Sequence, residues 1–378
     1  MSLPPTLHHR YSKMKKISLL TLSLALTALS LHACSQDKSS VLRGTDLPSE
    51  MEGQYVYLYD GQAKVDSALV KDGSFEVSMP QETSTKIYTV LMGSKGMPFF
   101  SEPGTSTLVV DGDNFAYDPG STELNKKVTT LYSRFNALYG DFMAANQELM
   151  QEVQAGGGTI TEEISAKGEK LSDDFNTKVA ALSREYFDDN KDNAFGLLAL
   201  SIYPMTDPKG FVEMYESAGE AVTSNEDMQK LYAMQKGELK TASGSPYTDV
   251  TMTDETGKSV KLSDYMEDGK YLLVDVWASW CGPCRAAMPH LAEIAKSHAE
   301  TINVLSVGGL NETPEANAKA REELGMTWST FFDSKSSLAD AYGVKSIPTL
   351  ILISPEGTIV LKTNRPDEVS DKISELGL

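Results

Sequence analysis

Trp280-Cys281-Gly282-Pro283-Cys284 is the stretch that decides the fold of this chain. The apolar run 271–276 before it predicts a buried strand, and residues 285–296 after it predict a helix. The first cysteine therefore lies at a helix N-terminus, where free backbone N–H groups and the helix dipole favour a thiolate over a thiol. Because the thiolate is the reactive form, this stretch predicts a site for thiol–disulfide exchange.

Composition and charge limit the class of protein. The chain has 378 residues, and a chain of this length usually folds into two or three domains. Its 40% hydrophobic and 23% charged residues are typical of globular proteins rather than disordered chains. The formal net charge is −19 and no cluster of Lys and Arg stands out, which excludes nucleic acid as a partner.

Residues 1–33 have the pattern of a processing signal. Lys15 and Lys16 precede an apolar run, 17–31, that is too short and too often interrupted by Ser and Thr to favour a membrane span. The run ends in Leu31-His32-Ala33-Cys34, which resembles the lipobox of bacterial lipoproteins. The resemblance implies that Cys34 carries a lipid and becomes the mature N-terminus. A simple secretory signal with an incidental cysteine is the alternative.

This leader predicts an extracytoplasmic protein that is anchored by its lipid to a bacterial membrane and faces the periplasm. Met14 gives a more typical leader than Met1, so the start codon stays open between the two. Residues 34–40 are then a short polar tether.

All three cysteines have an assigned role, so none remains for a structural disulfide. Of the three, Cys34 is assigned to the lipid, and Cys281 and Cys284 form the Cys-x-x-Cys pair. Only His290 and His298 lie beyond the leader, so neither a cysteine-based nor a histidine-rich metal site is expected. We predict no metal and no cofactor other than the redox-active disulfide of Cys281 and Cys284.

Residues 41–118 predict a small all-β domain of the sandwich type. Five short runs of β-branched and aromatic residues, separated by turns, suggest five or six strands. The runs are 54–59, 65–70, 75–79, 86–92 and 107–110. Asp72-Gly73 between two of these runs is a strong turn signal.

Residues 119–244 change to helical periodicity. Two long apolar stripes, over 124–142 and 164–186, are separated by Gly156-Gly157-Gly158. Shorter helices are expected over 193–203 and 210–234. The region is interpreted as a helical spacer or a dimerisation arm, so a homodimer through the N-terminal regions is one expected arrangement.

Residues 245–378 alternate short apolar runs with helical segments, which is typical of an α/β domain. Strands are expected near 271–276, 302–307, 329–332, 349–353 and 358–362. Helices are expected over 282–298, 314–324, 336–342 and 366–376.

Motifs in this last region resemble the thioredoxin family. They are the Trp-Cys-Gly-Pro-Cys stretch itself, Asp275 six residues before Cys281, Pro289 and Ile347-Pro348-Thr349. The lead-in over 254–265 and the insertion over 311–328 are similar to the exported TlpA/ResA-like subgroup of thiol–disulfide oxidoreductases. The resemblance implies a thioredoxin fold over residues 245–378.

The β-rich region carries a second, shorter resemblance. Val65-Asp66-Ser67-Ala68 and Asp72-Gly73-Ser74-Phe75 resemble an uncharacterised β-rich domain that precedes thioredoxin domains in exported bacterial lipoproteins. No catalytic constellation is visible there.

The thioredoxin resemblance implies a role for each matched catalytic residue. Cys281 is the nucleophile, and Cys284 is the resolving thiol that breaks the mixed disulfide. Asp275 is an acid inside an apolar strand, and it handles the proton of Cys284. Thioredoxins pair this acid with a lysine on the next strand, but no Lys occurs from residue 297 to 318.

The same resemblance implies five residues that bind substrate. Trp280 offers a flat apolar surface beside the cysteines. Gly282 and Pro283 keep the loop tight, because proline fixes φ and suits the first helical turn. Pro348 is expected in the cis form and has no N–H, so that Ile347 offers its backbone to an extended substrate segment.

We therefore expect an enzyme that reduces disulfides in exported proteins and is itself reduced by an upstream thiol electron donor. The Gly-Pro dipeptide is that of thioredoxin, whose potential is about −270 mV, against about −120 mV for the oxidant DsbA. A peroxiredoxin-like peroxidase is one alternative, although Ala278 stands where its Thr-x-x-Cys motif has Thr. A partner-binding lipoprotein that uses the thioredoxin fold as an adapter is the other.

Overall fold

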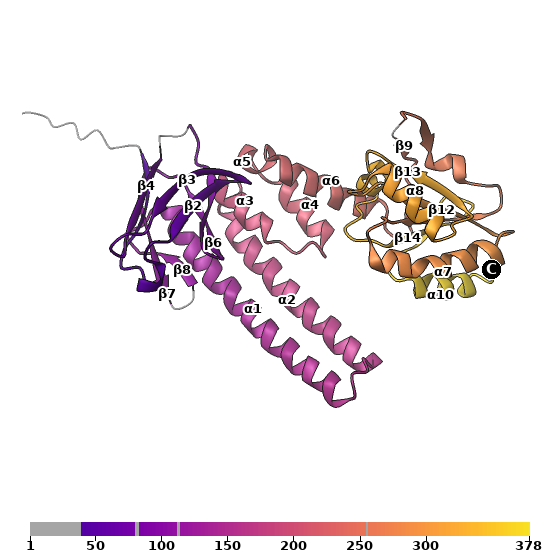
Figure 1. Cartoon of the computed structure of the whole chain (residues 1–378), viewed down its shortest axis with the longest axis horizontal. Helices are drawn as coiled ribbons and strands as arrows, with labels where there is room; N and C mark the ends of the chain where they lie inside the picture. Colours follow the sequence, from indigo (N-terminus) through magenta and orange to yellow (C-terminus); the bar gives the residue numbers. More distant parts are fainter. Residues whose placement is uncertain (1–38, 80–82, 112–113, 255) are drawn as a thin grey trace, which may run out of the picture. The chain divides into compact units, whose positions relative to one another are not determined.

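A computed structural model describes residues 39–79, 83–111, 114–254 and 256–378 (Figure 1). The predicted leader, Cys34 and most of the tether lie outside these residues. Within the described part of the chain, no helix combines the length and the apolar character needed to cross a membrane.

The first region is a sandwich of two four-stranded sheets, as the sequence predicted. One sheet has the order β4-β1-β7-β8, with strands at Phe75–Met79, Ser40–Gly44, Gly104–Asp111 and Asn114–Tyr117. The other has the order β3-β2-β5-β6, with strands at Ala63–Leu69, Tyr55–Asp60, Ile87–Met92 and Lys95–Phe100. A short 3₁₀ helix, Ser49–Met51, precedes β2. The inward-facing residues of both sheets share one apolar core, which includes Leu42, Leu58 and Phe99.

The expected number of strands, five or six, was too low. The strands β1, β6 and β8 were not predicted, and β6 contains Pro98. Proline is tolerated at the edge of a sheet, and β6 is an edge strand. Asp72 and Gly73 have φ of 51° and 66° and form the predicted turn, but this turn passes from β3 in one sheet to β4 in the other.

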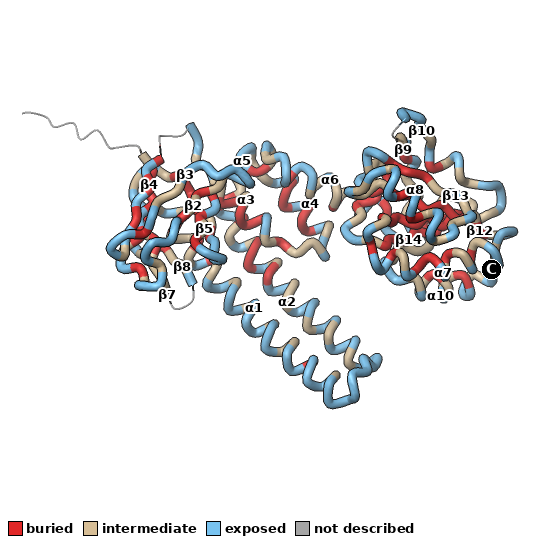
Figure 2. The backbone as a smooth tube through the Cα atoms, viewed as in Figure 1, coloured by how far each residue is buried: buried red, intermediate tan, exposed pale blue. Residues whose placement is uncertain are grey.

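The second region begins with a long helical hairpin. The helices α1 (Glu123–Ala155) and α2 (Glu162–Asp188) match the two predicted stripes. One end of the hairpin shares the core of the sandwich, through Val128, Leu131 and Leu182. The other end is largely exposed, as Figure 2 shows, and Met150 there is 43% exposed. The apolar stripes of α1 and α2 therefore pack into the core of the sandwich over only part of their length.

Four shorter helices follow, and here one prediction was wrong. They are α3 (Ala194–Ser201), α4 (Pro208–Glu216), α5 (Glu220–Thr223) and α6 (Glu226–Lys240). The single helix expected over 210–234 is broken because the side chain of Asn225 accepts the Met228 N–H and starts a new helix.

The third region has the thioredoxin fold. Its central sheet has the order β13-β12-β11-β14-β15. The strands are β11 (Tyr271–Val276), β12 (Ile302–Gly308), β13 (Ser329–Phe332), β14 (Thr349–Ile353) and β15 (Ile359–Thr363). Helices α7 (Gly282–Ser297), α8 (Pro314–Glu323), α9 (Ser337–Ala341) and α10 (Pro366–Glu375) complete it. The lead-in forms a small hairpin, β9 (Thr251–Thr253) with β10 (Ser259–Lys261), and a 3₁₀ turn at Leu262–Tyr265.

The central strand β11 separates two apolar layers. Leu272, Val274 and Val276 belong to one, whereas Leu273 and Trp277 pack with α7 and α10 in the other. Asp275 shares the face of Leu273 and Trp277, because alternate residues of a strand point the same way. The strand therefore directs one carboxyl into the layer that contains both cysteines.

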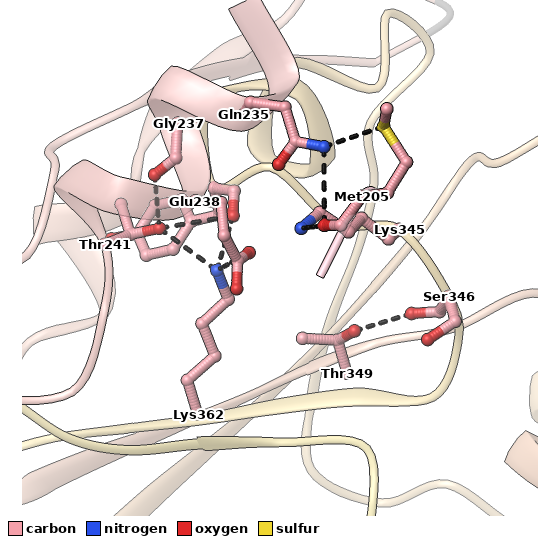
Figure 3. A network of polar contacts seen from close by, with 10 residues as sticks. Met205, Gln235, Gly237, Glu238, Thr241, Lys345, Ser346, Thr349 and Lys362 are labelled. Atoms are coloured by element: carbon pink, nitrogen blue, oxygen red, sulfur yellow. Dashed lines mark hydrogen bonds and ion pairs between the residues drawn. The ribbon is translucent and has the colours of Figure 1, made fainter. Parts of the chain in front are cut away.

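Helix α6 is tied to the thioredoxin region by polar contacts (Figure 3). Lys362 on β15 donates to Glu238 Oε2 at 2.6 Å, to Thr241 Oγ1 at 3.2 Å and to the Tyr342 carbonyl at 2.6 Å. A Cβ on Gly237 would lie 2.8 Å from the Ala341 carbonyl, so glycine permits this close approach. Lys345, in the loop before β14, donates to the Met205 carbonyl at 2.7 Å.

Candidate active site

Cys281 and Cys284 are joined by a disulfide at the start of α7. Cys281 is the N-cap residue, and its sulfur accepts the Cys284 N–H at 3.1 Å. Cys281 is 4% exposed and Cys284 is fully buried, so only the first cysteine has any contact with solvent. The helix terminus that the sequence predicted is thus in place, and its N–H group points at the predicted nucleophile.

Trp280 projects from this loop. Its side chain is 59% exposed, while its Nε1–H donates to the Leu310 carbonyl at 2.9 Å. Gly282 and Pro283 occupy the first turn of α7 and are exposed, and beyond the adjacent residues and the backbone of α7 itself no described atom lies within 4 Å of the position of a Cβ on Gly282. The three residues leave the face beside Cys281 open to a protein partner.

The Ile347–Pro348 peptide bond is cis, as predicted. It ends the loop before β14, and the Ile347 carbonyl oxygen lies 3.6 Å from the Cys281 sulfur. Pro348 is buried and Ile347 is half-buried. The structure therefore brings Ile347 next to the sulfur of Cys281, although the two residues lie 66 positions apart in the sequence.

Asp275 is buried, with 1% of its surface exposed. Its Oδ2 accepts a hydrogen bond from the Ser306 hydroxyl at 2.8 Å, and its Oδ1 has no partner among the described residues. Burial raises the pKa of Asp275 to about 7, although the Ser306 hydrogen bond lowers it. The carboxyl thus titrates in the pH range where thiol–disulfide exchange operates.

Ser306 lies on β12, the next strand, where the sequence has no lysine to pair with Asp275. It lies directly across from Asp275 in the β11–β12 pairing, and Trp328 Nε1–H donates to its Oγ at 2.9 Å. The sequence analysis did not select Ser306 or Trp328. Ser306 is one of the few polar residues in the run 302–308, which was the available signal, but its partner depends on the strand register.

Glu312 is a second residue that the sequence analysis missed. Its Oε2 accepts the Ser279 N–H at 2.8 Å, and its Oε1 accepts the Gly309 N–H at 3.0 Å and the Asn317 Nδ2–H at 2.9 Å. One carboxylate therefore joins the loop before Cys281 to the loop after β12. Nothing in the sequence distinguishes this glutamate from its exposed neighbours.

His290 makes a contact between two helices of the thioredoxin region. His290 Nε2 lies 3.1 Å from the Ser370 hydroxyl and links α7 to α10, which is a structural contact. Among the described residues, no group of three or more His, Cys, Asp or Glu side chains is arranged to hold a metal ion.

Comparison with known families gives two matches. Residues 243–362 match the model described as "AhpC/TSA family", and residues 44–175 match a domain of unknown function, DUF4369. The second match agrees with the predicted resemblance to an uncharacterised β-rich domain, and it also extends into α2.

The two relatives are named as a thiol-disulfide oxidoreductase and as a thioredoxin-like protein. Thiol-disulfide oxidoreductase ResA of Geobacillus kaustophilus is 31% identical, over 31% of this chain and 67% of the relative. Thioredoxin-like protein YneN of Bacillus subtilis is 30% identical, over 33% of this chain and 72% of the relative. These names favour the oxidoreductase over the peroxidase alternative.

Solved structures include the thioredoxin domain of a thiol-disulfide oxidoreductase from Bacteroides vulgatus. It is 30% identical, covers 36% of this chain and 97% of its own, and has a TM-score of 0.32. With its Cys-x-x-Cys at the start of α7, its cis-proline and the relatives above, the chain belongs to the thioredoxin-like thiol–disulfide oxidoreductases.

Proposed function

We propose that this protein is a lipid-anchored, extracytoplasmic reductase of protein disulfides. The observation that carries the proposal is the setting of Cys281: its sulfur accepts a helix N-terminal N–H and lies beside the Ile347 carbonyl, and the preceding residue, Trp280, is exposed. A nucleophile, a backbone for pairing and a docking surface thus meet at one sulfur.

The reaction begins with attack by Cys281. Its thiolate displaces one sulfur of the substrate disulfide, the substrate S–S bond breaks, and a mixed disulfide forms. The departing substrate sulfur leaves as a thiolate and takes up a proton. The Cys284 N–H, which points at the Cys281 sulfur, stabilises the thiolate before the attack.

Cys284 completes the exchange. Its thiol loses a proton and attacks the Cys281 sulfur, which forms the Cys281–Cys284 disulfide and releases the second substrate sulfur. The substrate gains two electrons and the enzyme loses two. We assign Asp275 as the group that accepts the Cys284 proton, because a carboxyl with a pKa of about 7 is partly ionised at neutral pH.

The substrate lies across the exposed edge of the site. An extended segment pairs with the backbone of Ile347, and Pro348 contributes no N–H that would compete. Trp280 packs against the segment, and Gly282 and Pro283 leave room for it, since both are exposed. The substrates are exported proteins with disulfides, and an upstream thiol donor restores the dithiol.

Trapping tests the chemistry. In Cys284→Ser the mixed disulfide on Cys281 is expected to persist, so that substrate proteins stay attached on a non-reducing gel and can be identified. The control is the double variant Cys281→Ser/Cys284→Ser, which should capture nothing. Equal capture by the two variants would contradict nucleophilic attack by Cys281.

Redox titration tests the direction of electron flow. We expect a potential near the thioredoxin value of about −270 mV for the Cys281–Cys284 pair. A value above about −180 mV, the range of disulfide isomerases, would contradict the assignment as a reductase.

The anchor is tested in cells. Wild-type protein should incorporate labelled palmitate and sediment with membranes, whereas Cys34→Ser should do neither. Unlabelled wild-type protein in the soluble fraction would contradict lipid anchoring without touching the chemistry of Cys281.

A further inference from the structure

Building on the role proposed for Asp275, we propose that Ser306 and Trp328 are positioning residues that make Oδ1 the oxygen of Asp275 that takes up and releases the proton. Ser306 is fully buried and donates to Oδ2 at 2.8 Å. Trp328 belongs to the segment between α8 and β13, and its Nε1–H reaches the Ser306 oxygen at 2.9 Å. The three side chains form one hydrogen-bonded row.

The direction of this row is fixed by chemistry. An indole N–H can only donate, so the Ser306 oxygen accepts from Trp328. The single hydroxyl hydrogen of Ser306 is directed to Asp275 Oδ2, which stays an acceptor. Because Oδ1 has no partner among the described residues, it is the oxygen left to bind a proton.

A neutral donor has a different effect from the lysine of thioredoxins. A cation beside a buried carboxylate holds it ionised, whereas a hydroxyl stabilises the ionised form only in part. Burial and the Ser306 hydrogen bond are the two causes that set the pKa of Asp275, and no charged side chain of the described residues adds to them. The carboxyl can therefore change its protonation state within each catalytic cycle.

The surroundings of Asp275 contain few titratable groups. Across the sheet, β12 places Ser306 and β14 places Leu350 opposite the carboxyl. In the layer that Asp275 faces, α7 contributes the two cysteines, and α10 contributes the aliphatic Val369 and Ile373. The thiol of Cys284 is thus the natural proton donor to Oδ1.

The test uses two variants of the row. Ser306→Ala removes the donor to Oδ2, and Trp328→Phe removes the donor to Ser306 but keeps an aromatic ring. We measure the pH dependence of substrate reduction in a single turnover of the full chain. Ser306→Ala should move the midpoint upward by about one pH unit, a tenfold change in proton affinity. Trp328→Phe should move it in the same direction by less.

Controls separate positioning from packing. Ser306→Thr keeps a hydroxyl and should keep the wild-type midpoint, and so should Ser354→Ala, which removes another buried hydroxyl after β14. In an Asp275→Asn background, Ser306→Ala should produce no further shift. An unchanged midpoint in Ser306→Ala would overturn the inference, and so would a shift that persists in the Asp275→Asn background, where no carboxyl is left to titrate.

A second readout does not depend on activity. The carboxyl band of Asp275 is isolated as the infrared difference between the wild type and Asp275→Asn, and its titration is followed in Ser306→Ala and Trp328→Phe. An upward shift of the titration midpoint of Asp275 in the two variants supports the role of Ser306 and Trp328. Identical midpoints in the wild type and both variants overturn it. If the wild type reduces no disulfide at any pH, the proposed function fails while this measurement still decides the roles of Ser306 and Trp328.

Discussion

Glu312 accepts the backbone N–H of Ser279 at 2.8 Å, and this contact joins two loops that meet at the active site. The other oxygen of the same carboxylate accepts the Gly309 N–H and the side-chain amide of Asn317, which is buried. The segment that contains Trp280 and leads to Cys281 is therefore held by a residue 33 positions away. Loop geometry, rather than a further reactive group, is what this glutamate supplies.

Glu312→Ala is expected to lower both stability and activity. The change leaves two backbone N–H groups and a buried amide without their acceptor, which costs about 1–3 kcal/mol. All three tryptophans, Trp277, Trp280 and Trp328, lie in the thioredoxin region, so fluorescence during urea unfolding reports on this region. The control is Glu322→Ala, an exposed glutamate nearby, and equal effects of the two changes would contradict the role of Glu312.

Asp275 should make the thioredoxin region less stable as the pH rises. Its folded pKa of about 7 exceeds the unfolded value of about 3.9, so the folded state binds more protons between these values and stability falls with increasing pH. The loss is complete above pH 7 and amounts to at most about 4 kcal/mol. Asp275→Asn should therefore stabilise the protein at pH 8 and have much less effect at pH 4.

Urea unfolding at both pH values checks this expectation. Asp268→Asn, which changes an exposed aspartate, serves as the control and should shift neither curve. If Asp275→Asn changed stability equally at pH 4 and pH 8, the carboxyl would not titrate near 7 in the folded protein.

Lys362→Met should weaken the attachment of α6. The lysine side chain is only 10% exposed and donates to Glu238, Thr241 and the Tyr342 carbonyl, so its loss leaves a partly buried carboxylate without its cation. We expect a loss of about 1–3 kcal/mol and faster proteolytic cleavage near residues 241–246. The control is Lys230→Met. Lys230 lies on α6 and forms an exposed ion pair with Asp227, so its loss should cost less than about 1 kcal/mol.

A double-mutant cycle measures the interaction energy between Lys362 and Glu238. Lys362→Met and Glu238→Gln should each destabilise the protein, and their combination should cost less than the two separate losses together. Strict additivity would show that the two side chains do not interact.

Trp280→Ala should affect protein substrates more than small ones. The ring is largely exposed, so stability should change little, but a protein partner loses an aromatic contact at the centre of its docking surface. We expect kcat/KM for insulin to fall about tenfold and the rate with a small aromatic disulfide to fall less than about twofold. Equal losses with both substrates would instead mean that the ring shapes the Cys281 loop through its bond to Leu310.

The local sequence was sufficient for the reactive centre. A Cys-x-x-Cys pair after an apolar strand, with Asp275 before it and Ile347-Pro348 later, is a pattern of neighbouring residues, and the structure has a strand, a helix N-terminus and a cis-proline at these positions. The helices α1 and α2 could also be predicted from their apolar stripes, because helical periodicity is a local property of the sequence.

Only the tertiary structure decided what surrounds that centre. Ser306 meets Asp275 across 31 positions, Trp328 meets Ser306 across 22, and Glu312 meets Ser279 across 33. Likewise, β6 became a strand despite Pro98 because it lies at the edge of its sheet. Strand register and sheet order arise from the packing of the whole core, which no short stretch of sequence encodes. The sequence thus predicted which sulfur attacks, and the fold decided which groups surround Asp275 and hold the loop before Cys281.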